Sequence, residues 1–296
     1  MYRLFVITRH TFFEALVQPI YSLLLAIGAA ILMVFGALPF FTLGEDTVMY
    51  KSVSLDVILL FVLISTLFAT SRSIYEEIED RTMLTLMSKP VSRWEVLVGK
   101  YLGIIAAAAL AVALMGVVLM LCTYLRIPND YQLRANALDD REQAQLWGYR
   151  LMHLSGLVPS LILLWLQISV LAAVGVALST RFSLVVNLPT VILLYVAGNL
   201  TRFLPLDHGS GFLRGIAWVI STLLPYLQVF DLRDLTVYKP IRVAGTQFEN
   251  NPAGVYLSTI WTYLGIAAAY GLAYVTFALS AGLWSFRTRE LGGAEG

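Results

Sequence analysis

Long runs without a charged residue constrain this chain more than any other feature. Tyr101–Leu125 and Leu154–Thr180 contain no Asp, Glu, Lys or Arg, and Ala15–Leu43 is equally free of charge. A helix needs roughly 20 apolar residues to cross the hydrocarbon core of a bilayer. Only 13% of the 296 residues are charged, whereas soluble proteins carry roughly 25%. The sequence therefore predicts an integral membrane protein, and its net charge of +1 provides no basic face for nucleic acid.

We predict an all-α, polytopic integral membrane protein that forms a single transmembrane domain over residues 1–296. In the second span only Val57–Ser71 lacks charge, so Asp46 and Lys51 are assigned to the preceding loop and Asp56 to the headgroup level. Arg181 and Ser183 mark a tight turn between two antiparallel neighbours. Six transmembrane helices are expected, over residues 20–41, 55–71, 101–125, 155–179, 183–201 and 255–286.

Three further segments are expected around these spans. Met1–Gln18 mixes charged and apolar residues, as in an amphipathic helix at the membrane surface or a charged flank of the first span. Gly215–Phe230 is too short to span and contains Pro225, so it favours a re-entrant or interfacial helix, with a seventh span left open. Arg126–His153 is expected to be a mixed-charge loop that includes a surface helix at residues 139–150.

The segment Tyr75–Lys100 is strongly charged and must lie in water between two spans, because charges in hydrocarbon cost several kcal/mol each. Within it, five of the six residues from Glu76 to Arg81 are ionisable. Glu77 and Arg81 have the spacing of a helical ion pair. Ser92 and Glu95 have the spacing of a capping box, so one helix should end near Ser88 and another begin at Arg93. The pattern favours a docking surface for a soluble partner over a plain solvated loop.

The stretch EIEDRTMLTLMSKPVSRWEVLVGK, which ends at Lys100, resembles the cytoplasmic segment of type-2 ATP-binding-cassette (ABC) exporter permeases. Those proteins show a pattern like E-x-x-x-G-T-x-x-x-L-x-x-x-P-[VI]-S-R-x-x-x-x-x-x-K between their second and third spans. Arg81 departs from it, where the family often has Gly. Residues 286–290 resemble the family's usual ending, and the closest likeness is to the multicopper-enzyme-maturation branch. The matching residues are Glu77, Thr82, Leu86, Pro90, Val91, Ser92, Arg93 and Lys100.

The resemblance implies a permease that pairs with a second copy or paralogue in the inner (cytoplasmic) membrane. A separate cytoplasmic ATPase subunit would dock on it and drive substrate export, so ATP and Mg²⁺ would bind the partner, while this chain would carry no catalytic residue and no cofactor. No G-x-x-x-x-G-K-[ST] phosphate loop occurs in the chain. The implied docking residues are Glu76, Glu77, Glu79, Asp80, Arg81, Thr82, Leu86, Pro90, Ser92, Arg93 and Lys100.

The orientation follows from where basic residues stand relative to the spans. Lys and Arg are equally numerous on the two sides, but those on the side of the termini lie close to span ends. Both termini and the charged segment are therefore expected inside the cell. The basic residues that support this orientation are Arg9, Arg72, Arg93, Lys100, Arg181, Arg287 and Arg289.

Two other classes of protein are compatible with parts of the sequence. Residues Glu76–Arg81 also fit the E-E-x-x-x-R motif of an intramembrane protease, which would need histidines on nearby helices. An ATP-independent transporter or channel would show charged or broken spans at mid-membrane. Cys122 and the 8 Met are expected to pack between helices rather than bind metal. Gln167 and Asn187 are expected to form interhelical hydrogen bonds.

Overall fold

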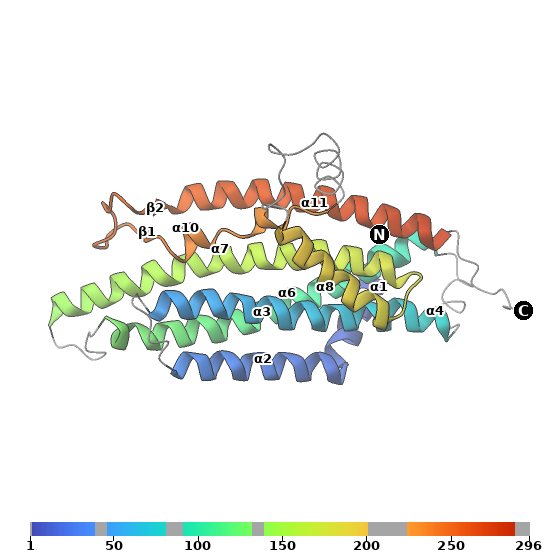
Figure 1. Ribbon diagram of the computed structural model, residues 1–296, viewed down its shortest axis with the longest axis horizontal. Coiled ribbons are helices and arrows are strands. Elements are labelled where there is room, and N and C mark those ends of the chain that lie inside the picture. The colour runs from blue at the N-terminus through green and yellow to red at the C-terminus, as the bar shows by residue number, and fades with distance from the viewer. Residues whose placement is uncertain (1, 39–45, 81–90, 132–138, 201–223, 288–296) are drawn as a thin grey trace, which may run out of the picture.

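The computed structural model describes residues 2–38, 46–80, 91–131, 139–200 and 224–287. Its long helices lie roughly along one axis, and α1 lies toward the bundle end at which α11 ends (Figure 1). The helices are α1 (Tyr2–Val17), α2 (Pro19–Ala37), α3 (Asp46–Thr70), the π-helix η1 (Ser71–Glu76), α4 (Glu77–Glu79), α6 (Arg93–Asp130), α7 (Asp140–Ser179), α8 (Leu184–Leu200), the 3-10 helix η3 (Leu227–Phe230), α10 (Arg233–Thr236) and α11 (Leu257–Arg287).

Helices α3, α6 and α7 form the centre of the bundle, with α2 and α11 on opposite sides of them (Figure 1). The central helices bury apolar residues completely, for example Leu63, Ala108 and Leu171. The outer helices instead expose large apolar side chains, such as Leu193 on α8 and Phe277 on α11. Such a surface is costly in water but suits contact with lipid tails, because these are as apolar as the side chains.

Five of the described helices, namely α2, α3 with its extension to Glu79, α6, α7 and α11, are long and apolar enough to cross a bilayer. Helix α8 is apolar but has only 17 residues. The structure therefore supports an all-α multi-pass architecture, and a count of six spans stays a prediction that depends on α8. The predicted tight turn at Arg181 and Ser183 is present between α7 and α8.

The predicted N-terminal helix is present as α1 and packs across the first turns of α6. Two glycines on α6 permit this close approach. A Cβ at Gly103 would lie 2.6 Å from the carbonyl oxygen of Thr8, and one at Gly99 would lie 2.9 Å from the Ile7 side chain. The location of α1 at the membrane surface stays a prediction.

The prediction that Asp46 and Lys51 belong to a loop before residue 55 is wrong. Helix α3 begins at Asp46, and the Lys51 side chain is only 2% exposed. Its ammonium group lies 2.9 Å from Nδ1 of His153 on α7 and donates to the Val237 carbonyl oxygen at 3.4 Å. Polar partners on other elements compensate for the burial of this charge, and a sequence pattern gives no sign of them.

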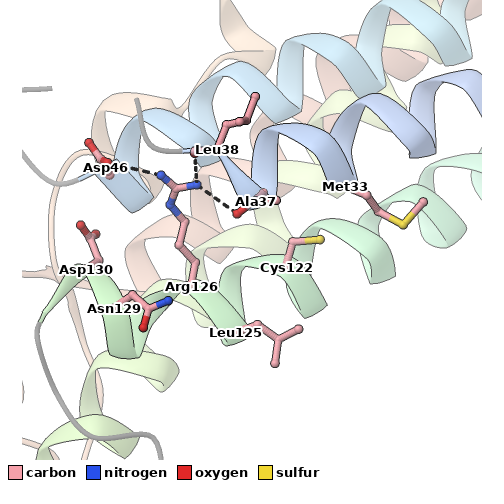
Figure 2. Close-up of a pocket in the computed structure, with 10 residues that line it drawn as sticks. Met33, Ala37, Leu38, Asp46, Cys122, Leu125, Arg126, Asn129 and Asp130 are labelled. Carbon is pink, nitrogen blue, oxygen red and sulfur yellow. Dashed lines mark hydrogen bonds and ion pairs between the residues drawn. The ribbon is translucent and has the colours of Figure 1, made fainter. Parts of the chain in front are cut away.

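Both predicted bounds of the loop from Arg126 to His153 are also wrong. Helix α6 continues to Asp130 through Pro128, and α7 begins at Asp140, with Asp139 as its N-cap. Residues 139–150 therefore form the first turns of α7 rather than a separate surface helix. Figure 2 shows one reason why α6 extends so far. Arg126 donates to the Gly36 and Leu38 carbonyl oxygens, at 3.1 and 2.8 Å, and so satisfies the C-terminus of α2.

The described residues before α11, 224–256, form short elements. Most of the helix predicted at 215–230 lies outside the described residues, but its last four residues form η3. Gln228 on η3 donates to the Asn199 carbonyl oxygen at the end of α8, at 2.8 Å. Farther on, the strands β1 (Ile241–Arg242) and β2 (Val255–Tyr256) pair in parallel, a small departure from the all-α prediction.

Candidate functional site

The candidate site lies where α3 ends and α6 begins, at the bundle end where α11 also ends (Figure 1). Here α3 continues as the π-helix η1 and then α4. π-helical turns are rare and often occur at functional sites. This turn arranges the side chains so that Ile74 and Ile78 are buried, while Glu76, Glu79 and Asp80 are exposed. An acidic surface therefore covers an apolar base.

A buried ion pair connects this acidic surface to α6. The Lys100 ammonium lies 2.7 Å from Oε1 of Glu77, and the two side chains are 4% and 26% exposed. Lys100 also donates to the Ser73 carbonyl oxygen and to the Ser73 hydroxyl. The carboxylate compensates for the buried positive charge. Glu77 and Lys100 thus join α4, η1 and α6, and neither of these two side chains forms part of the exposed acidic surface.

The start of α6 is tied to the end of α11. The predicted capping box is present, with the Ser92 backbone N–H donating to the Glu95 carboxylate at 2.9 Å. Arg93 donates to the carbonyl oxygens of Phe286 and Arg287 at 2.8 and 3.0 Å. A guanidinium at this position suits the negative end of the α11 dipole. Sequence reasoning found Ser92, Glu95 and Arg93 but not the partner of Arg93 at the C-terminus of α11, for which the sequence carries no signal.

Four predicted site residues, Arg81, Thr82, Leu86 and Pro90, lie outside the described residues, as does the helix end predicted near Ser88. The predicted Glu77–Arg81 pair stays untested, because only Glu77 is described. Ser73, by contrast, was missed by sequence reasoning because it contributes chiefly through its backbone carbonyl.

Polar groups also meet toward the opposite end of the bundle. Arg233 on α10 binds Asp56 on α3 through two hydrogen bonds of 2.8 and 2.5 Å. Burial acts to lower the pKa of Arg233, but its hydrogen bonds and charge attraction to Asp56 outweigh this effect and raise the pKa above its ordinary value. A small cavity of about 80 Å³ lies beside the pair, between α3, α7 and α8.

The described geometry does not assemble the site of an E-E-x-x-x-R protease. Glu77 is paired with Lys100, and His153 binds Lys51, which lies 26 residues before Glu77 on the same continuous helix. At 1.5 Å per residue this separation is about 39 Å. His10 lies near Glu14 on α1, and His208 is outside the described residues. Among the described residues, no group of three or more His, Cys, Asp or Glu side chains could hold a metal ion.

Polar residues inside the bundle connect neighbouring helices. Asn187 on α8 donates to the Gly175 carbonyl oxygen and to the Ser179 hydroxyl of α7, at 3.1 and 2.7 Å. The predicted interhelical hydrogen bonding of Asn187 is therefore confirmed. Cys122 on α6 lies against Gly36 of α2. A Cβ added at Gly36 would lie 3.3 Å from the Cys122 Sγ, and both residues line the cavity of Figure 2.

Long apolar helices around a buried core, with charged groups gathered at the two ends, define a multi-pass membrane protein. A sequence profile described as ABC-2 family transporter protein matches residues 38–280, and the chain belongs to this family. The match covers the central helices α3, α6 and α7 and the whole charged segment at residues 75–100. No curated protein matches the chain.

Proposed function

We propose that this chain is the permease subunit of an ABC exporter and that residues 75–100 dock a separate cytoplasmic ATPase subunit. The observation that carries the proposal is the exposed acidic surface of Glu76, Glu79 and Asp80 above a fixed base. Exposed charges can attract a basic partner surface, while Glu77 and Lys100 hold the base in place. ATP and Mg²⁺ would bind the partner, and a second copy or a paralogue would complete the transporter.

The contacts at this end would carry movement into the bundle. Lys100 joins the end of α3 to α6, and Arg93 joins α6 to α11. Rigid helices and packed side chains transmit displacement over long distances. A push on the acidic surface would therefore move three helices together, and along α3 it would reach Asp56, about 26 Å beyond Ser73 at 1.5 Å per residue. Export as the direction, and the multicopper-enzyme-maturation branch, stay predictions.

Reversing two exposed charges tests the docking role. In the double variant Glu79→Lys/Asp80→Lys, we expect ATPase retention to fall about tenfold or more, because like charges facing a basic partner cost several kcal/mol. The measurement purifies the full chain from its native membranes and quantifies, by mass spectrometry, any co-purifying subunit that contains a G-x-x-x-x-G-K-[ST] loop. The matched control, Asp140→Lys/Asp234→Lys, reverses two exposed charges toward the other end and should retain the subunit fully. Equal retention by both double variants would refute the docking role.

The predicted orientation has its own test in intact cells. In a Cys122→Ser background we expect a membrane-impermeant maleimide to label Asp140→Cys but not Asp80→Cys. Both positions are exposed, and they lie at opposite ends of the bundle. Opening the cells should make Asp80→Cys reactive, which shows that its thiol is accessible. Labelling of Asp80→Cys from outside would place the acidic surface away from any cytoplasmic ATPase.

A second candidate function is ATP-independent transport, which the Asp56–Arg233 ion pair favours. Charged residues within membrane helices often mark substrate or ion paths, and this pair lines the cavity between α3, α7 and α8. The retention measurement separates the two functions, because a secondary transporter would retain no ATPase subunit even in the unchanged protein.

A further inference from the structure

A polar cavity lies inside the bundle, between α3, α7 and α8. Asp56 lies about 15 Å along α3 from its first residue, at 1.5 Å per residue, and Figure 1 shows that α8 ends near the middle of the bundle. The cavity therefore lies within the length of the bundle and not at its tips. The chain from Phe230 to Arg233 adds a further wall. The polar lining includes Asp56, Gln167, Tyr195, Asn199, Asp231 and Arg233.

Hydrogen bonds between elements hold the walls of this cavity in place. Gln228 on η3 donates to the Asn199 carbonyl oxygen at the end of α8, at 2.8 Å. The hydroxyls of Ser160 on α7 and Thr236 on α10 share a hydrogen bond of 2.7 Å. The walls are thus fixed before a ligand arrives, which lowers the entropic cost of binding.

The charged lining of the cavity is acidic on balance. Arg233 donates to both carboxylate oxygens of Asp56, at 2.8 and 2.5 Å, and its Nε lies 3.5 Å from Oδ1 of Asp231. Among the described lining residues Arg233 is the one cation, so two negative charges and one positive charge leave a net charge of −1. A carboxylate can accept about four hydrogen bonds, so Asp56 and Asp231 keep acceptor capacity beside Arg233. The cavity therefore favours a cation.

The buried amide of Gln167 is an independent sign of a ligand. Gln167 is only 6% exposed and lines the cavity, yet no hydrogen bond joins its side-chain amide to another described residue. The predicted interhelical hydrogen bond of Gln167 is therefore not formed in this part of the chain. Buried amides are nearly always hydrogen-bonded, because a missing partner costs free energy. An amide without one at a cavity wall indicates that a polar ligand completes its bonding.

The aromatic lining and the small volume restrict the cation further. Tyr195 and Phe230 both line the cavity, and aromatic faces attract ammonium groups. The volume is about 80 Å³, well below the roughly 300 Å³ at which drug-sized sites begin. The cavity therefore has room for the head group of a ligand but not for a large body.

We propose that this cavity binds the primary ammonium group of an organic amine, which donates to the carboxylates of Asp56 and Asp231 and to the amide oxygen of Gln167. An ammonium group has three N–H donors and no acceptor, so these three acceptors match it. A free alkylamine and the head group of an aminophospholipid share this chemistry. The proposal goes beyond the proposed function, because binding here requires no ATPase subunit. Loss of ATPase retention would leave the amine site intact, and failure of amine binding would leave the docking surface intact.

Binding to the purified full chain in dodecyl maltoside micelles tests the proposal with two pairs of probes. Calorimetry compares butylamine, which is protonated at neutral pH, with uncharged butanol. Native mass spectrometry compares phosphatidylethanolamine with phosphatidylethanol of the same acyl chains, which lacks the amino group. We expect at least one amine to bind about tenfold more tightly than its matched probe, since a hydrogen bond to a charged group is worth roughly that factor. A preference for butylamine identifies a free amine as the ligand, and a preference for phosphatidylethanolamine identifies a lipid.

A pair of matched variants separates a local charge effect from a general one. Asp231→Asn removes one negative charge but keeps a side-chain oxygen for the backbone N–H of Arg233, which donates to Asp231 at 3.2 Å. This variant should weaken amine binding about tenfold. Asp234 is also exposed and lies on α10, but it is not part of the lining. Asp234→Asn should therefore bind the amine as the unchanged protein does.

Replacing Gln167 with methionine tests the amide itself. Gln167→Met keeps a similar volume and should also weaken amine binding about tenfold. It should not lower the resistance of the chain to sodium dodecyl sulfate in mixed micelles, because methionine removes a buried polar group that lacks a partner. Absence of a preference for either amine, equal binding losses in Asp231→Asn and Asp234→Asn, or unchanged binding in Gln167→Met would overturn the proposal.

Discussion

Replacing Lys100 with methionine is expected to lower the free energy of unfolding by about 3 kcal/mol, because removing one partner of a buried ion pair leaves the charge of the other without compensation. The Lys100 ammonium is 2.7 Å from Glu77 and also serves two oxygens of Ser73. Methionine fills similar volume but donates no hydrogen bond. The partly exposed Glu77 carboxylate would lose its ion pair with Lys100, and this connection between α4 and α6 would be lost.

Unfolding in mixed micelles with increasing sodium dodecyl sulfate, followed by circular dichroism, measures this loss. Arg72→Met is the matched control, because Arg72 is an exposed cation on η1 at the same end, and surface changes of this kind usually stay within about 0.5 kcal/mol. The double variant Lys100→Met/Glu77→Leu should recover most of the stability, since replacing both partners by apolar groups is often nearly neutral. A loss for Lys100→Met no larger than that for Arg72→Met would mean that the pair does not join the helices.

Replacing Gly156 with alanine is expected to cost about 3 kcal/mol through overpacking. A Cβ at Gly156 on α7 would lie 2.2 Å from the Thr236 carbonyl oxygen and 2.7 Å from Cδ1 of Ile241. Backbone atoms cannot rotate away, so residues 236–241 would have to move off α7. That movement would also disturb the 2.7 Å hydrogen bond between Ser160 and Thr236.

Gly148→Ala is the control for this substitution, on the same helix two turns earlier. Its Cβ would find its nearest neighbour at 3.6 Å, which is ordinary contact, and alanine favours the helix by up to about 1 kcal/mol relative to glycine. The same denaturation in mixed micelles should therefore show a loss at Gly156 and no loss at Gly148. Equal stability of the two variants would show that the segment after α10 does not rest on Gly156.

Local patterns predicted those features that depend on neighbouring residues in the chain. The uncharged run Tyr101–Leu125 lies entirely within α6, and the spacing of Ser92 and Glu95 located the start of that helix. The turn at Arg181 was readable for the same reason, because a break between two apolar runs is a local signal. The family was also readable, since its motif occupies one continuous segment, which lies within the match to residues 38–280.

The sequence by itself determined that the chain is a helical membrane protein that carries one strongly charged segment, because hydropathy and capping act over a few residues. Only the tertiary structure decided that Lys51 lies within a helix and that Glu77 is turned toward Lys100. It also decided that Lys51 and His153 line one cavity. A buried charge is stable only where partners from other helices meet it. Those partners lie 102 residues away for Lys51 and 23 residues away for Glu77, so folding had to bring them together.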